Sequence, residues 1–286
     1  MTYGFIRENS SKYSIGLMCD ALKISRSSYY SYTSGKKESK RSLENEILLR
    51  EIKAIYRESK CRYGSPRITA ALRARGIKTG KNRIARIMKE NSIAVKCRHK
   101  RFYTKNPNKQ VNADLVERRF NPIVRNSIWG SDITYIRTRE GWKYLSVVMD
   151  LYSRMIIAWK VNDSQDENII LRIIENALDR RNPESGLIFH SDRGSQYCST
   201  RVKNILQCNG IKQSMGAKGT CYDNAVLESF FSTLKKELIY REKYQDVDDL
   251  KKSLFEYIEI FYNRQRKHST LGYLSPFEFE SKNDNC

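Results

Sequence analysis

Three carboxylates in this 286-residue chain lie in different local settings. Asp132 lies in residues 128–137, which alternate in the manner of a β-strand; Asp192 follows a short apolar stretch; Glu228 lies on an amphipathic helix. Carboxylate oxygens are the ligands that Mg²⁺ takes in proteins. Two such ions about 4 Å apart can clamp the attacking and leaving oxygens of a phosphodiester displacement. We therefore treat these three side chains as candidate metal ligands.

The elements around these residues predict a mixed α/β sheet with flanking helices. Residues 128–137, 142–149 and 155–161 are expected to form an antiparallel meander. Further along the chain we expect a helix opened by Ser164 or Asp166, a strand over 187–190, a helix over 200–208, a strand over 211–214, the Glu228 helix, and a last helix over 247–263. The strand that precedes Asp192 would have to lie next to the strand of Asp132.

The helix that carries Glu228 has a polar and an apolar face. Asn224, Glu228 and Lys235 share one face by helical spacing. The opposite side is apolar and consists of Val226, Leu227, Phe230, Phe231, Leu234 and Leu238. Glu228 is therefore expected to point away from the core, as a metal ligand must. Lys235 projects from the same face and could contact a phosphate beside the metals.

The charge of the chain is concentrated in its first part. The net charge is +21; residues 1–120 hold 29 Lys and Arg against 10 Asp and Glu, whereas residues 121–286 hold 24 against 22. This asymmetry indicates a part that binds nucleic acid, joined to a separate part that carries out the chemistry. The alternative is a basic face that only keeps the protein soluble.

Residues 1–35 are expected to form a small helical unit in which Ser25 caps a helix. Residues 43–95 show three helical patterns and suit a helix-turn-helix-like DNA-binding domain, with Ser65 and Pro66 as N-cap and first residue of the middle helix. The third helix would present Lys81, Asn82, Arg83, Arg86 and Lys89 to DNA, with Asn82 or Arg83 reaching base edges. An ordinary helical hairpin with a basic exterior is the alternative. Residues 96–122 look like a basic linker that follows a DNA backbone.

Several classes of protein are disfavoured by composition. No apolar run approaches the roughly 20 residues that span a bilayer, and the N-terminus lacks the apolar segment of a signal peptide. We therefore expect no membrane association and a cytoplasmic location. The seven cysteines form no C-x-x-C pair and only three histidines are present, so a zinc site is disfavoured and reduced, mostly buried thiols are expected.

Several strings resemble one family. They are Trp129…Asp132-Ile-Thr-Tyr-Ile136, Tyr144-Leu…Asp150-Leu-Tyr-Ser-Arg154, His190-Ser-Asp-Arg-Gly-Ser-Gln-Tyr197, Lys218-Gly…Asp223-Asn-Ala…Glu228-Ser-Phe-Phe and Phe261-Tyr-Asn-Arg…His268-Ser-Thr-Leu-Gly-Tyr…Pro276. Together they resemble the OrfB-type transposases of the IS-three family of bacterial insertion sequences, relatives of retroviral integrases. Upstream, Tyr63-Gly-Ser-Pro-Arg-Ile and Arg83-Ile-Ala-Arg-Ile-Met extend the resemblance over nearly the whole chain. Thirty-five residues separate Asp192 from Glu228, the interval characteristic of this family.

The resemblance implies an RNase H-like catalytic domain over residues 123–286. It implies that Asp132, Asp192 and Glu228 form a DDE triad holding two Mg²⁺ (or Mn²⁺) ions. The implied activity is a transposase that cleaves double-stranded DNA at element ends and transfers the freed 3′-hydroxyl. It also implies a homo-multimer on DNA, a bacterial, nucleoid-associated location, and a possible fusion or partnership with an upstream-frame product. One departure is the segment Met215–Gly219, which lacks a basic residue common in the family and could weaken one DNA contact.

Several residues could have an ordinary structural role instead of a role in catalysis or binding. Asp150 could bind metal, but turn capping explains it equally well. His190 could support the metal ligands from behind or contact DNA, or it could simply pack, and Asn224 is a second candidate supporting group. Asp223 suits an N-cap, and Trp129 and Trp142 suit the core or the sheet surface. A further basic set could bind DNA or suit a helix end, namely Arg264, Arg266, Lys267 and His268.

Two other functions compete with transposition. One is a DNA-binding regulator whose integrase-like half is an inactive scaffold, against which the three intact carboxylates argue. The other is an RNase H-like nuclease or resolvase that cuts without joining, against which the basic helical half and the family strings argue.

Overall fold

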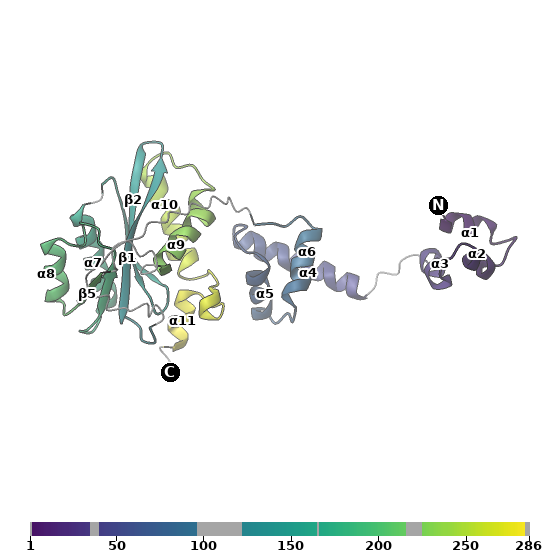
Figure 1. Ribbon diagram of the computed structural model, residues 1–286, viewed down its shortest axis with the longest axis horizontal. Coiled ribbons are helices and arrows are strands. Elements are labelled where there is room, and N and C mark those ends of the chain that lie inside the picture. Colours follow the sequence, from purple (N-terminus) through teal and green to yellow (C-terminus); the bar gives the residue numbers. More distant parts are fainter. Residues whose placement is uncertain (1, 35–39, 96–121, 165, 216–224, 284–286) are drawn as a thin grey trace, which may run out of the picture. The chain divides into compact units, whose positions relative to one another are not determined.

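The computed structural model describes residues 2–34, 40–95, 122–164, 166–215 and 225–283. The chain divides into two compact units, Met1–Ala94 and Val95–Cys286. The first is all helical, and the second is built on a sheet (Figure 1). The basic linker predicted over residues 96–122 falls almost entirely outside the described residues.

The first helices enclose a small core of their own. They are α1 (Thr2–Asn9), α2 (Ile15–Ala21) and α3 (Arg26–Thr33). Ile6, Met18, Cys19 and Tyr29 are buried together. Ser25 caps α3 as predicted, because its hydroxyl accepts a hydrogen bond from the backbone N–H of Ser28.

Three further helices follow, α4 (Lys40–Glu58), α5 (Ser65–Ala74) and α6 (Lys81–Glu90), and each packs against the other two. Their apolar faces are buried, as the three- and four-residue spacing predicts. The predicted cap of α5 is off by one residue. Gly64 is the N-cap in extended backbone, and Ser65 is the first helical residue.

The second unit contains a five-stranded mixed sheet in the order β3-β2-β1-β4-β5. The strands are β1 (Ile128–Thr138), β2 (Gly141–Asp150), β3 (Ile156–Asn162), β4 (Ile188–Ser191) and β5 (Lys212–Met215). The first three form the predicted antiparallel meander. β4 and β5 join in parallel, and β4 lies beside β1 as the position of Asp192 required.

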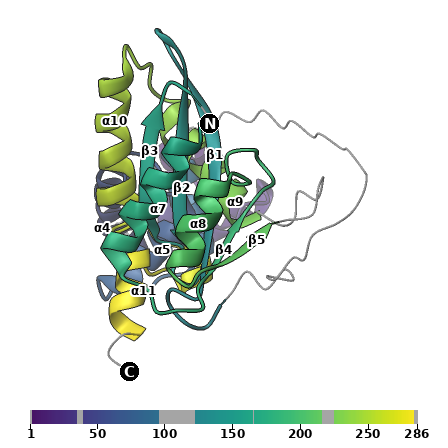
Figure 2. The same ribbon diagram turned by 90° about the vertical axis from the view of Figure 1, so that its left-hand side faces the viewer.

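Helices cover both faces of this sheet (Figure 2). On one face, α7 (Glu167–Arg181) and α8 (Thr200–Cys208) bury the main apolar core together with Trp129, Phe189 and Tyr197. Asp166 caps α7 through the N–H of Ile169, and α8 has the predicted bounds.

The other face is covered by the C-terminal helices. These are α9 (Ala225–Leu234), η2 (Lys235–Ile239), α10 (Val247–Phe255), η3 (Glu256–Tyr262), η4 (Ser269–Leu271) and α11 (Pro276–Asn283). The predicted helix over 247–263 is therefore two segments, because the α-helix widens into a π-helical turn at Glu256. A similar π-helical turn, η2, continues the helix of Glu228. Such turns frequently occur near functional sites.

The structure bears on two expectations that were drawn from the composition, one about membrane helices and one about cysteines. Among the described residues, no helix is both long and apolar enough to cross a bilayer. The described cysteines carry free thiols, but only Cys19 is buried, while Cys198 and Cys208 are exposed. The expectation of mostly buried thiols is therefore wrong for the described part of the chain, because Cys198 lies in the segment between β4 and α8 and Cys208 is the last residue of α8.

Candidate active site

The register of two parallel strands places Asp132 beside Asp192. Ser131 of β1 pairs with Ser191 of β4, and this is the last pair of the ladder. Asp132 is the next residue of β1, and Asp192 is the first residue after β4. Because paired strands lie about 4.8 Å apart, the two carboxylates emerge as neighbours at one edge of the sheet.

A glycine lets the Glu228 helix approach this edge. A Cβ atom at Gly130 would lie 3.0 Å from Cδ1 of Leu227 and 3.2 Å from Cδ2 of Leu151. Leu227 is fully buried and is the residue before Glu228. Only the missing side chain of Gly130 allows this packing without a shift. We did not single out Gly130 from the sequence, although a glycine inside a strand is the signal of such a close approach.

The charges of the other two carboxylates influence the protonation of Asp132. Burial, and to a smaller extent the negative charges of Asp192 and Glu228, raise the pKa of Asp132 to about 7. The backbone N–H of Ile133, 2.8 Å from Oδ1, and the cation of Lys235 act in the opposite direction. Asp132 is therefore close enough to feel the charges of two groups that are distant from it in sequence.

The other two carboxylates are open to solvent. Oδ1 of Asp192 accepts a hydrogen bond of 2.9 Å from the N–H of Gly194, and a Cβ atom at Gly194 would lie 3.0 Å from this oxygen. Glu228 is exposed on α9, and desolvation raises its pKa. Neither carboxylate forms an ion pair with a residue in the described part of the chain. Both are thus available to an added cation.

Lys235 reaches the same edge from η2. Desolvation lowers the pKa of its ammonium group, and the charge of Asp132 opposes this change. The Nζ atom lies 4.9 Å from the ring centroid of Tyr135. The sequence placed Lys235 near Asp132 and Glu228, and the electrostatic influence of Asp132 agrees with that placement.

The site fits a divalent cation chemically, but no metal cage is preassembled. Within the described ranges, no three His, Cys, Asp or Glu side chains lie close enough to enclose an ion. The donor set consists solely of carboxylate oxygens, which suits Mg²⁺ and Mn²⁺. Oδ2 of Asp132 accepts no hydrogen bond from any described residue. A cation would relieve the repulsion that the three carboxylates exert on one another.

The residues expected to support the ligands have different outcomes. His190 is 2 % exposed and its Nδ1 lies 3.0 Å from Oγ of Ser214 on β5, so the alternative of a DNA contact is wrong. Asn224 and Asp223 lie outside the described residues, as does most of the segment that departs from the family pattern. Tyr197 is buried, and its hydroxyl lies 2.9 Å from Oγ of Ser131, so it has a structural role.

Asp150 is a capping residue, not a metal ligand. Its carboxylate accepts hydrogen bonds of 3.0 Å from the backbone N–H groups of Asn126 and Tyr152. Burial raises its pKa to about 6, and the two backbone hydrogen bonds oppose the rise. Both oxygens already have partners, which confirms the turn-capping interpretation.

One predicted DNA contact in the helical unit needs correction. Arg83 donates to Oδ1 of Asn45 at 2.9 Å and to Oε2 of Glu44 at 3.1 Å. It therefore ties α6 to α4 and is not free to read bases. The other predicted contacts of α6 are exposed, namely Lys81, Asn82, Arg86 and Lys89. Among them, Arg86 lies 3.9 Å from Glu90.

Two members of the basic set near the C-terminus, Arg266 and His268, are buried in the protein. Arg266 is 4 % exposed and forms a two-pronged ion pair with Glu237 of η2, with two contacts of 2.9 Å. The hydroxyl of Tyr257 donates to the same carboxylate at 2.9 Å. Lys267 pairs with Glu278. Neither interpretation from the sequence is right for Arg266, because its charge holds the end of the Glu228 helix against the C-terminal helices.

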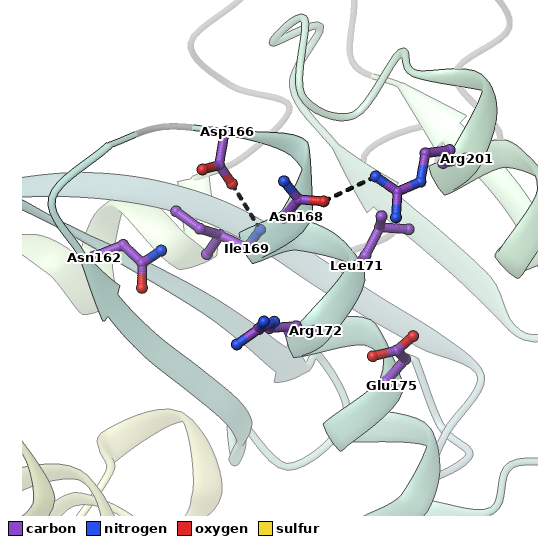
Figure 3. A pocket seen from close by; sticks show the side chains of 8 residues that line it. All are labelled: Asn162, Asp166, Asn168, Ile169, Leu171, Arg172, Glu175 and Arg201. Carbon is purple, nitrogen blue, oxygen red and sulfur yellow. Dashed lines mark hydrogen bonds between the residues drawn. The ribbon is translucent and has the colours of Figure 1, made fainter.

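A separate pocket of about 460 Å³ lies at the start of α7 (Figure 3). Its lining is mostly polar and comprises Asn162, Asp166, Asn168, Ile169, Leu171, Arg172, Glu175 and Arg201. Arg201 already contacts Asn168 at 2.8 Å and Glu167 at 3.2 Å. None of the three candidate catalytic carboxylates lines this pocket, so it is not the chemical centre.

Comparison with known proteins decides the family. The profile described as an integrase core domain matches residues 124–221, a second integrase core profile matches 209–276, and an HTH-like domain profile matches 42–101. The chain is 37% identical over 291 residues to the transposase InsF for insertion sequence IS3A of Escherichia coli (strain K12), covering 99% of both chains. The chain belongs to this family of insertion-sequence transposases. Another relative is the insertion element IS600 uncharacterized 31 kDa protein of Shigella sonnei, which is 38% identical over 93% of this chain and 98% of that protein.

Membership of the family confirms the predicted fold class. It is an integrase-core-like mixed sheet with flanking helices, preceded by a helical, HTH-like region. Among solved structures, a simian T-cell lymphotropic virus intasome has a TM-score of 0.48 and 15% identity, over 79% of this chain and 73% of that one. The HTLV-2 integrase catalytic core in complex with magnesium has a TM-score of 0.43 and 15% identity, over 55% of this chain and 97% of that one.

Proposed function

We propose that this transposase cuts DNA at the ends of an insertion element and joins the freed 3′-hydroxyl to a target phosphodiester. Asp132, Asp192 and Glu228 would hold two Mg²⁺ (or Mn²⁺) ions. The observation that carries the proposal is the electrostatic environment of Asp132. Burial and the negative charges of Asp192 and Glu228 raise the pKa of its carboxyl group, and the positive charge of Lys235 lowers that pKa. A half-buried carboxylate with a raised pKa beside two exposed ones suits a polynucleotidyl transferase.

The reaction has two displacements at phosphorus. In the first, a water oxygen bonds to phosphorus, the bond to the 3′-oxygen breaks, and that oxygen leaves as a 3′-hydroxyl. In the second, this hydroxyl bonds to a target phosphorus and a target 3′-oxygen leaves, so the number of phosphodiester bonds is unchanged. Divalent ions, when bound, lower the pKa of the attacking water and neutralise charge on the transition state.

The residues of the chain supply positioning and charge. The three carboxylates hold the ions, and the ammonium group of Lys235 can face a phosphate oxygen beside them. No serine or tyrosine nucleophile is needed, and Tyr197 is unavailable because it is buried and bonded to Ser131. His190 holds β4 to β5 through Ser214 and would support Asp192 from two residues away.

We assign DNA binding to the helical parts, residues 1–35 and 43–95, with residues 96–122 as a basic linker to the catalytic domain over 123–286. Lys81, Asn82, Arg86 and Lys89 would contact double-stranded DNA from the exposed side of α6. Synapsis of two element ends calls for a homo-multimer on DNA. A partnership with an upstream-frame product and a nucleoid-associated, cytoplasmic location in bacteria complete the proposal.

The test is incubation of the full chain with labelled DNA that carries the flanking element ends, with Mg²⁺ or with EDTA. Nicked and joined products are expected only with Mg²⁺. Asp192→Asn should lower both products by about 10²–10³-fold, the scale for losing one group that stabilises transition-state charge. DNA binding by this variant should stay near that of the wild type.

Three outcomes would count against the proposal. Nicked products without joined products would favour a nuclease or resolvase. Normal joining by Asp192→Asn would remove this residue from the mechanism, and equal inactivity of both proteins would favour a DNA-binding regulator. Asp248→Asn is the matched control, because Asp248 is an exposed aspartate in an ion pair on α10.

A further inference from the structure

Two exposed aromatic rings and two cations form a row on the β1–β2 hairpin and η2. The ring centroids of Tyr135 and Trp142 lie 5.3 Å apart at 82°. Nζ of Lys235 lies 4.9 Å from the Tyr135 centroid, and Cζ of Arg137 lies 5.2 Å from the Trp142 ring. We call these four residues the aromatic–cation row. Of the two positions expected for Trp142, the core and the sheet surface, the structure shows the second: Trp142 is 49% exposed on β2, and Tyr135 is 57% exposed.

The row begins beside the candidate active site. Tyr135 lies three residues beyond Asp132 on β1. The pairing of β1 with β4 ends at Ser131, so the part of β1 that carries the row pairs only with β2 among the described strands. Lys235 belongs to both features, because the charge of Asp132 acts on its ammonium group while that group lies against Tyr135.

The charges of the row are not neutralised within the described part of the protein. Neither Arg137 nor Lys235 forms an ion pair or hydrogen bond with a described residue. The acidic side chain in the hairpin turn, Glu140, lies 3.2 Å from Nζ of Lys143 and so has its own partner. The row therefore offers two cations without ion-pair partners among the described residues to an incoming ligand.

Rings and cations together suit one class of ligand. Large rings in water are stabilised when a flat apolar group covers them. Guanidinium and ammonium groups over the rings would make a purely apolar protein surface a poor partner. A nucleic-acid strand offers both a flat base and a phosphate, and base stacking on aromatic side chains is a general mode of single-strand binding.

We propose that the aromatic–cation row stacks an unpaired DNA base next to the phosphodiester held at the three carboxylates, with Arg137 and Lys235 against the flanking phosphates. A base reaches a protein ring only when it is unpaired, and strand cleavage at a DNA end releases such a base. The inference rests on the proposed function for the origin of this strand.

The intrinsic fluorescence of the full chain tests the stacking directly. The chain has three tryptophans. Trp129 is 1% exposed and Trp159 donates its Nε1–H to Glu259 at 2.9 Å, which leaves Trp142 as the exposed indole. A duplex with a short single-stranded 5′ overhang, the kind of end left when cleavage frees a 3′-hydroxyl, should quench the emission, and a blunt duplex should quench it less. The quenching should disappear in Trp142→Phe and persist in Trp159→Phe.

Affinity gives a second readout. Trp142→Ala should weaken binding of the overhang duplex roughly tenfold, measured by fluorescence anisotropy, whereas Trp142→Phe should keep most of the affinity. Phe277→Ala is the matched control: Phe277 is 47% exposed and has Arg264 at 5.2 Å from its ring, but it lies on α11. It should bind as the wild type does. Thermal unfolding should be unchanged in all three variants.

The experiment is run in EDTA, so that its result does not depend on cleavage. Three results would overturn the proposal. The wild type could bind the overhang without quenching, or Trp142→Phe could be quenched as strongly as the wild type. The third is that Trp142→Ala binds as tightly as Phe277→Ala. Failure of the proposed function would appear separately, as cleavage and joining that do not require Asp192.

Discussion

Two aspartates on the β1–β2 ladder are treated in opposite ways by the fold. Asp150 pairs with Trp129, and Asp132 lies three residues further along β1. Burial raises the pKa of both, to about 6 and about 7. Asp150 is fully buried and both of its oxygens accept backbone hydrogen bonds. Asp132 accepts one hydrogen bond, from its own neighbour, and faces two other carboxylates.

The difference separates structural from chemical carboxylates. A carboxylate whose oxygens have protein partners stabilises the fold and has nothing left to bind. A carboxylate that faces like charges destabilises the folded protein, and this arrangement persists where function requires it. Glu237 belongs with Asp150, because Arg266 and Tyr257 already satisfy it. Loss of a structural carboxylate should lower stability, and loss of a chemical one should lower cation binding.

The largest expected effect on stability is at the buried ion pair. Glu237→Gln should lower the free energy of unfolding by about 3–5 kcal/mol, because it leaves the buried guanidinium of Arg266 without its charged partner. Urea unfolding monitored by circular dichroism measures this. The control Asp248→Asn breaks an exposed pair with Lys251 and should cost less than about 1 kcal/mol. Equal effects of the two variants would refute the assignment of Glu237 as structural.

A smaller loss is expected at the capping aspartate. Asp150→Asn keeps one acceptor oxygen and replaces the other with a donor, which leaves a buried backbone N–H unsatisfied. The free energy of unfolding should fall by roughly 1–3 kcal/mol, as measured by urea unfolding. Cleavage per folded molecule should not change. A cleavage defect in the stable, folded fraction would move Asp150 into the chemical class.

The smallest effect is a pH dependence. The pKa of Asp150 is about 6 when folded and about 3.9 when unfolded, so the folded state binds more protons between these values. The stability contribution is present at low pH and is lost as pH rises through 6. From pH 5 to pH 7.5, the wild type should therefore lose roughly 1 kcal/mol relative to Asp150→Asn. Parallel stability profiles of the two proteins would contradict the assigned pKa.

Much of the catalytic unit could be predicted from local patterns. Alternation predicted the meander, and the apolar run before Asp192 predicted β4 to within one residue. That Asp132 and Asp192 lie close together could also be predicted. Two carboxylates can hold the same metal ions only if the strand before Asp192 lies next to the strand of Asp132. Glu228 followed from helical spacing, since Leu227 and Phe230 are buried while Glu228 is exposed.

The failures have one physical source, which is pairing between residues far apart in sequence. Arg83 looked like a DNA contact, but its partners lie 38 and 39 residues upstream. Arg266 looked like a helix-end or DNA cation, but its partner lies 29 residues upstream in a π-helical turn that no local pattern predicts. Local patterns report burial by periodicity, not the identity of a distant partner.

Binding of Mn²⁺ to the full chain, followed by isothermal titration calorimetry without DNA, tests the central claim most directly. The wild type and Asp150→Asn should bind the ion with the same saturable affinity, and Asp132→Asn should lose this binding by at least about tenfold. Mn²⁺ binding by Asp132→Asn that matches the wild type would contradict the claim that Asp132, Asp192 and Glu228 hold the metal together.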